Sequence, residues 1–114
     1  MSIVVSEGPA IVAGYEYKLQ IEADSPIFPA GCTLAAQVRL KVSDSSVIAT
    51  LSTANGGLVR ITDTIVEIII PPTATSSLAA GSVFMDMVRT DLSPDRHMNF
   101  NSELPVIRPV TRGL

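Results

Sequence analysis

The chain has 114 residues, of which 46% are hydrophobic and only 17% are charged, and it carries a net charge of −3. This length fits a single domain, residues 1–114, and the hydrophobic fraction excludes an intrinsically disordered chain. The acidic balance and the scattered basic residues do not favour nucleic-acid binding, and no apolar run is long enough to span a membrane. A surface this sparse in charge favours contacts with other subunits, so we expect a homo-oligomer or a component of an assembly.

The chain contains one cysteine, Cys32, and one histidine, His97. A single cysteine excludes an internal disulfide, and these two residues alone cannot form a zinc site. We expect Cys32 to be a buried structural thiol, with a reactive thiol as the alternative if it lies exposed beside a cation. No Lys or Arg precedes Lys18, so we expect no secretory leader and a protein made in the cytoplasm. The sequence predicts neither a metal nor a cofactor.

The first quarter of the chain contains one clear strand pattern. Residues 1–13 hold two short apolar runs separated by Glu7-Gly8-Pro9, and we expect an N-terminal arm or an edge strand there. Residues 15–23 alternate strictly between apolar and polar side chains, which predicts a strand with one buried face. The following loop contains Ile27 and Phe28, which we expect to close one end of the core.

A second alternating segment follows. Residues 33–42 predict another half-buried strand, and the alternation assigns Leu40 and Val42 to its buried face. A polar loop leads from there to a short strand over residues 47–52.

The middle of the chain holds the most apolar segment. Asn55-Gly56-Gly57 is a turn signal of the kind that joins hairpin strands, and residues 58–61 form the next expected strand. Residues 64–70 are β-branched at almost every position, which predicts a central strand covered on most of both faces. Pro71-Pro72 ends it, because proline cannot donate to a β-ladder.

The last third begins with a helix signal. Hydroxyl side chains, an apolar run and a glycine predict one short helical turn near residues 75–80. Strands are expected over 82–90, 97–102 and 104–110, and the prolines of the last one indicate an edge position. Residues 111–114 form a short tail.

Eight or nine short strands at a spacing of about ten residues indicate the fold class. We predict an all-β chain that forms a single antiparallel β-sandwich (Ig-like) or a partly open barrel.

Few residues offer catalytic chemistry. Glu67 and Asp86 both lie inside apolar strands, where a carboxylate needs a cation or several donors. We predict a structural ion pair between Asp86 and Arg39, with Arg89 as the other basic residue within strand reach. An enzyme that uses Asp86, Glu67 or His97 remains an alternative, but we predict no catalytic, cofactor-binding or metal-binding residue and no enzyme activity.

From residue 13 to residue 112, the order of these features resembles a small β-domain of phage and prophage structural proteins. It is similar to the N-terminal domain of siphophage upper baseplate proteins, although Phe84-Met85 and the loop from Pro26 to Pro29 depart from that pattern. The matching segments are Gly14 to Leu19, Ala36-Gln37-Val38-Arg39, the glycine-rich hairpin, Ile65 to Ile70, Thr75 to Gly81, Val83 to Met87 and Val110-Thr111-Arg112.

This resemblance implies a non-catalytic virion protein of a tail, baseplate or head–tail junction that acts through contacts with other virion proteins. It supplies no catalytic residue. The alternative is a carbohydrate-binding or adhesion-type sandwich with a surface patch built around Tyr15, Tyr17 or Phe28, for which the absence of Trp is unfavourable.

Overall fold

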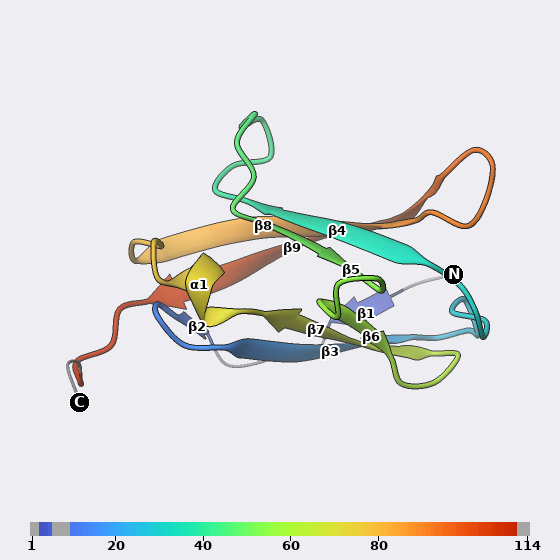
Figure 1. Ribbon diagram of the computed structural model, residues 1–114, viewed down its shortest axis with the longest axis horizontal. Helices are drawn as coiled ribbons and strands as arrows, with labels where there is room; N and C mark the ends of the chain where they lie inside the picture. The colour runs from blue at the N-terminus through green and yellow to red at the C-terminus, as the bar shows by residue number, and fades with distance from the viewer. Residues whose placement is uncertain (1–2, 6–9, 112–114) are drawn as a thin grey trace.

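The chain folds into two β-sheets that face each other, as Figure 1 shows for the computed structural model. The structure describes residues 3–5 and 10–111. The two layers carry nine strands in the described part of the chain, joined by short connections and one helical turn. The all-β fold predicted from the sequence is confirmed.

The first sheet has four strands, all antiparallel, in the order β1-β3-β7-β6. Its inner members are the alternating strand and the most apolar strand of the sequence, which lie side by side. The bounds are β1 (Ile3–Val5), β3 (Tyr17–Ala23), β7 (Ile65–Ile70) and β6 (Leu58–Arg60).

The second sheet has five strands in the order β2-β9-β8-β4-β5. All its pairs are antiparallel except β2 with β9, which run parallel. β1 and β2 therefore belong to different sheets. The bounds are β2 (Ile11–Val12), β9 (Arg96–Ile107), β8 (Gly81–Arg89), β4 (Leu34–Arg39) and β5 (Ala49–Ser52).

This strand order is that of an immunoglobulin-like sandwich. In such a fold, strands A, B, E and D form one sheet, and C, F and G form the other, with C′ added at the edge of the second. The first sheet has β1, β3, β7 and β6 in the places of A, B, E and D. The second sheet has β4, β8, β9 and β5 in the places of C, F, G and C′.

The inner faces of both sheets form one hydrophobic core. β3 is buried at every second residue, so the strict alternation of its sequence becomes one inner and one outer face. Leu19, Val38 and Ile68 all lie in the core, and Phe28 is completely buried at one end of it, as expected. The outer face of β7 is half-buried rather than covered.

Two elements differ from their predictions. The helix α1 spans Pro72–Thr75, several residues before the predicted turn, because a proline at the first helical position is already fixed in a helical φ. The last strands form one continuous β9 that lies between β8 and β2, not at an edge. Its Pro105 is tolerated because β2 pairs only with Val106 and Ile107.

The residues at the chain ends are only partly described. β1 and β2 are both edge strands, whereas residues 1–2 and 6–9 of the expected N-terminal arm or edge strand, residues 1–13, lie outside the described part. The tail expected at 111–114 is described only at Thr111.

The side chain of Asn55 covers the outer edge of β5. Its Oδ1 accepts the N–H groups of Ser52 and Gly57, both at 2.9 Å, and its Nδ2 donates to the carbonyl of Thr50 at 2.9 Å. These backbone groups would otherwise be open to another strand.

Candidate functional site

Asp86 and His97 form a pair on the outer face of the five-stranded sheet. The His97 Nε2 lies 2.9 Å from Asp86 Oδ2, and both side chains are about four-tenths exposed. The register explains how they meet: Asp86 lies opposite Asn101, and a β-bulge between Asp86 and Val88 then brings His97 opposite Val88. Without that shift His97 would lie two positions further away from Asp86, because a bulge changes the register of the ladder.

The ion pair predicted between Asp86 and Arg39 is therefore replaced by other contacts. Asp86 binds His97, while the Arg39 guanidinium donates to Gln37 Oε1 at 2.6 Å and to the carbonyl of Asp44 at 2.7 Å. The Asp86 side chain is partly exposed to water, so its carboxylate does not need an Arg or Lys beside it. Glu67, the third residue considered for catalysis, lies on β7 in the other sheet, so the three residues do not form one site.

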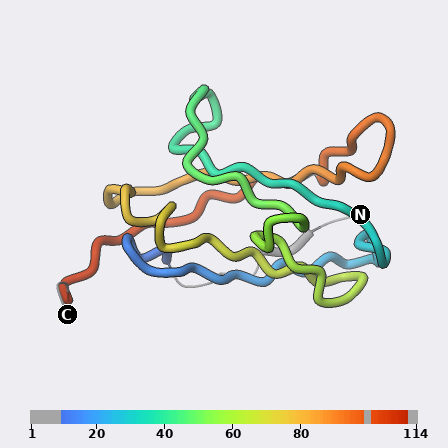
Figure 2. Tube along the Cα trace, viewed as in Figure 1, coloured from blue at the N-terminus to red at the C-terminus, as the bar shows by residue number. Residues whose placement is uncertain are grey.

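Arg39 organises the connection between β4 and β5, residues 40–48, which we call the 40–48 loop. Besides the carbonyl of Asp44, its guanidinium reaches that of Ser46 at 3.4 Å. The loop closes on the sheet where Ile48 donates its N–H to the Val38 carbonyl at 2.7 Å. In Figures 1 and 2 this loop projects well beyond the layer that contains β4 and β8.

The 40–48 loop carries three exposed aliphatic side chains. Leu40 is 50% exposed, Val42 66% and Val47 37%. The sequence pattern assigned Leu40 and Val42 to the buried face, and that prediction is wrong, because β4 ends at Arg39 and the chain leaves the sheet there. The alternation of apolar and polar residues continues past Arg39, so the sequence pattern did not indicate that Leu40 and Val42 are exposed.

Beside the loop, the outer face of the sheet is hollowed. A depression of about 240 Å³ is lined by residues of β4, β8, β9 and the loop: Gln37, Arg39, Val42, Phe84, Met85, Asp86 and Asn101. Its lining combines apolar side chains with amide, guanidinium and carboxylate groups, and such mixtures also occur at protein–protein contact surfaces.

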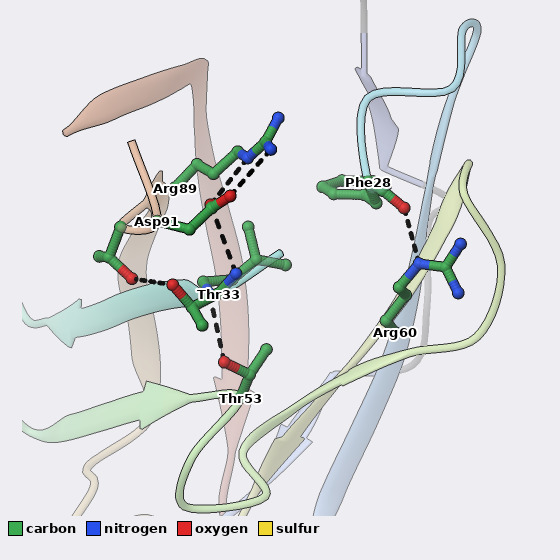
Figure 3. Close-up of polar contacts among 8 residues, drawn as sticks. Phe28, Thr33, Thr53, Arg60, Arg89 and Asp91 are labelled. Atoms are coloured by element: carbon green, nitrogen blue, oxygen red, sulfur yellow. Dashed lines mark hydrogen bonds and ion pairs between the residues drawn. The ribbon is translucent and has the colours of Figure 1, made fainter. Parts of the chain in front are cut away.

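Arg89 and Asp91 form an ion pair at the far end of β8, shown in Figure 3. Arg89 Nε and Asp91 Oδ1 are 2.8 Å apart, and a second bond of 2.9 Å joins the guanidinium to Oδ2. The hydrogen bonds from Arg89 lower the pKa of Asp91 from 3.8 to about 2. Asp91 Oδ1 also accepts the N–H of Thr33 at 3.4 Å, so the pair fixes the chain just before β4 begins.

Cys32 directly precedes Thr33, whose N–H is bound by Asp91, and it is only 7% exposed. Burial raises the pKa of its thiol, and this outweighs the opposite effect of the Arg89 guanidinium. The thiol is therefore protonated at neutral pH, which agrees with a structural role. Arg60 donates from Nε to the Phe28 carbonyl at 2.6 Å and holds the loop before Cys32 against β6 (Figure 3).

A groove of about 500 Å³ lies where β2, the start of β3 and the C-terminal segment meet. We call it the groove throughout. Its lining is mostly apolar and includes both tyrosines of the chain: Ala10, Val12, Tyr15, Glu16, Tyr17, Lys18, Pro109, Val110 and Thr111. Clefts that bind ligands have volumes of roughly 300–1,000 Å³.

The turn that forms one wall of the groove is held by Thr75 of α1. Thr75 is completely buried, and its hydroxyl donates to the Tyr15 carbonyl at 2.8 Å and accepts the Gly14 N–H at 3.2 Å. Gly14 has a φ of +90°, a conformation that other residues rarely adopt. These two hydrogen bonds hold the turn in place.

The three aromatic residues considered for a carbohydrate-binding patch differ in exposure. Phe28 is fully buried, Tyr17 is 4% exposed, and of the three residues only Tyr15, at 48%, presents its ring to solvent.

The described residues contain no group of three or more His, Cys, Asp or Glu side chains arranged to hold a metal ion. Within the same part of the chain, no helix has the length and hydrophobicity needed to cross a membrane. No protein-family model, no curated protein and no solved structure matches this chain.

Proposed function

We propose that this chain is a non-catalytic structural subunit that acts by binding other protein subunits, and that it is a virion protein of a phage or prophage. The observation that carries the assembly role is the 40–48 loop, which holds Leu40, Val42 and Val47 out in solvent. Burial of apolar surface contributes about 25 cal/mol per Å², so covering these side chains favours association.

The way the loop is held supports the same role. Association costs less conformational entropy when the contacting segment is already ordered. Arg39 provides that order through its bonds to the carbonyls of Asp44 and Ser46. The depression beside the loop, which Val42 and Arg39 also line, offers room for a side chain of the partner.

Sedimentation velocity at increasing protein concentration tests the assembly role. We expect self-association of the wild type, and we expect Val42→Glu to shift the protein to monomer by placing a charge in the contact. Val59→Glu is the matched control, because Val59 is also an exposed valine but lies on β6 in the other sheet. A wild type that stays monomeric at high concentration, or equal effects of the two substitutions, would contradict the proposal.

The virion assignment rests on the resemblance of residues 13–112 to phage structural domains. It is tested by reading the genes next to the one that encodes this chain. Neighbours that encode tail, baseplate or head–tail proteins would support it, and neighbours with no relation to a virion would contradict it.

A further inference from the structure

The turn between β5 and β6 places an asparagine directly before a glycine. Asn55 and Gly56 are both exposed, and both line a depression of about 200 Å³ at the surface. In such a sequence the glycine nitrogen can attack the asparagine side-chain carbon Cγ and close a five-membered ring, because glycine has no Cβ to obstruct the approach. Water is the only other reactant, and an exposed turn is in contact with it.

Two backbone donors hold the side-chain carbonyl of Asn55. Its Oδ1 accepts the N–H groups of Ser52 and Gly57, both at 2.9 Å. Attack at Cγ places negative charge on Oδ1, and two N–H groups at this distance stabilise such a charge as the donors of an oxyanion hole do. The N–H of Gly56, which belongs to the attacking nitrogen, takes part in neither bond. The bonds that fix the amide therefore also polarise its carbon for attack.

The surrounding contacts keep this arrangement in place. The Asn55 N–H donates to Ser52 Oγ at 3.1 Å, and the Gly57 carbonyl accepts the Ile69 N–H at 2.8 Å. A Cβ on Gly57 would lie 3.0 Å from Asn55 Oδ1 and 2.9 Å from the Leu51 side chain. A larger residue at position 57 would thus disturb the contact between its N–H and the Asn55 amide.

We propose that Asn55 is a site of spontaneous deamidation in the folded protein. The Gly56 nitrogen loses its proton to water and bonds to Cγ, while the Cγ–Nδ2 bond breaks and Nδ2 leaves as ammonia with a proton from water. One water molecule then opens the succinimide ring. Addition of water at Cγ yields aspartate, and addition at the main-chain carbonyl carbon of Asn55 yields isoaspartate. The net change consumes one water and releases one ammonia, with no oxidation or reduction.

Deamidation removes one of the hydrogen bonds that hold β5. The Asn55 Nδ2 donates to the Thr50 carbonyl at 2.9 Å, and a carboxylate oxygen in its place cannot donate. In isoaspartate the main chain also gains a methylene group, which lengthens the turn between β5 and β6. Because β5 is the edge strand of its sheet, either product loosens its attachment. This chemistry concerns the chain alone and is independent of any partner.

Incubation of the folded wild-type protein in mildly alkaline buffer tests the proposal, because such a buffer removes the proton of the attacking nitrogen more often. We expect mass spectrometry to locate the conversion at Asn55 and an isoaspartate-specific methyltransferase to label the same peptide. Asn101 is the internal control, since it is also exposed but lies within β9 and precedes a serine. Equal conversion at the two asparagines, or an intact Asn55 in protein that keeps its folded circular-dichroism spectrum, would overturn the proposal.

Gly56→Ala tests the route of the reaction. No atom lies within 4 Å of the position that the added methyl group would take, but Gly56 has a φ of +80°, so we expect a folded and somewhat less stable protein. Conversion at Asn55 is expected to slow several-fold, because the methyl group obstructs the attacking nitrogen. An unchanged rate in the folded variant would show that water attacks the amide directly and would overturn attack by Gly56.

Asn55→Asp tests the consequence for β5. This variant is the aspartate product, so we expect faster hydrogen exchange of the β5 amides than in the wild type, and the aged wild-type protein is expected to shift in the same direction. Asn101→Asp is the matched control and is expected to leave exchange in β5 unchanged. Equal exchange in Asn55→Asp and the wild type would contradict the loosening of β5.

Discussion

β3 and β4 carry the same alternating sequence pattern but end in different ways. The pattern of β3 ends inside the sheet, where Ala23 is still buried and pairs with β1. The pattern before and after the end of β4 looks equally regular, yet the chain leaves the sheet at Arg39 and exposes Leu40 and Val42. Periodicity therefore predicts which residues share a face, but backbone hydrogen bonds decide where that face stops.

The largest expected effect compares two leucines of the β4 pattern. Leu34 is 1% exposed and Leu40 is 50% exposed, although the sequence gives them the same face. We expect Leu34→Ala to lower the free energy of unfolding by about 2–5 kcal/mol through lost burial and a cavity. Leu40→Ala is expected to change it by less than about 0.5 kcal/mol. Urea unfolding measures both, and equal losses would show that Leu40 is packed.

A smaller effect is expected where β3 begins. Thr75→Val keeps the shape of the side chain but removes the bonds to the Tyr15 carbonyl and the Gly14 N–H. We expect a loss of about 1–3 kcal/mol, because these backbone groups lose a partly buried partner. The control is Thr73→Val, an exposed threonine of the same helix. If the two variants unfold at the same urea concentration, Thr75 does not hold this turn.

The smallest effect concerns the start of β4, and it depends on pH. The pKa of Asp91 is lowered from 3.8 to about 2 in the folded state. Its stabilising contribution is therefore complete above pH 3.8 and is lost as the pH falls through about 2. We expect Asp91→Asn to be less stable than wild type at neutral pH and the difference to vanish near pH 2.

Urea unfolding across this pH range checks that prediction. Asp95→Asn is the control, since Asp95 is an exposed aspartate of the same connection between β8 and β9. A difference between wild type and Asp91→Asn that stays constant with pH would show that the ion pair with Arg89 is not its source.

The sequence was sufficient to predict the all-β fold and most of the residues in its core. Leu19, Val38, Ile68 and Phe28 follow from local alternation and from one apolar loop, so short-range pattern predicts them. The parallel pairing of β2 with β9 could not be predicted, because it joins residues 95 positions apart, as Ile11 and Val106 are, with no tight turn between them.

The candidate sites were less predictable than the core. Asp86 and His97 were both recognised as unusual, but their contact depends on a β-bulge that no residue type in β8 signals. The groove brings Tyr17 and Val110 together from opposite ends of the chain. Only the folded topology reveals that these two residues line one groove.

The Asn55 amide on the rim of β5 protects one edge of the five-stranded sheet. A bare rim would let one molecule continue the hydrogen-bonded ribbon of the next, and repetition of that step yields fibrils. Because Asn55 already engages the Thr50 carbonyl and the Ser52 N–H, such growth is disfavoured at the β5 rim.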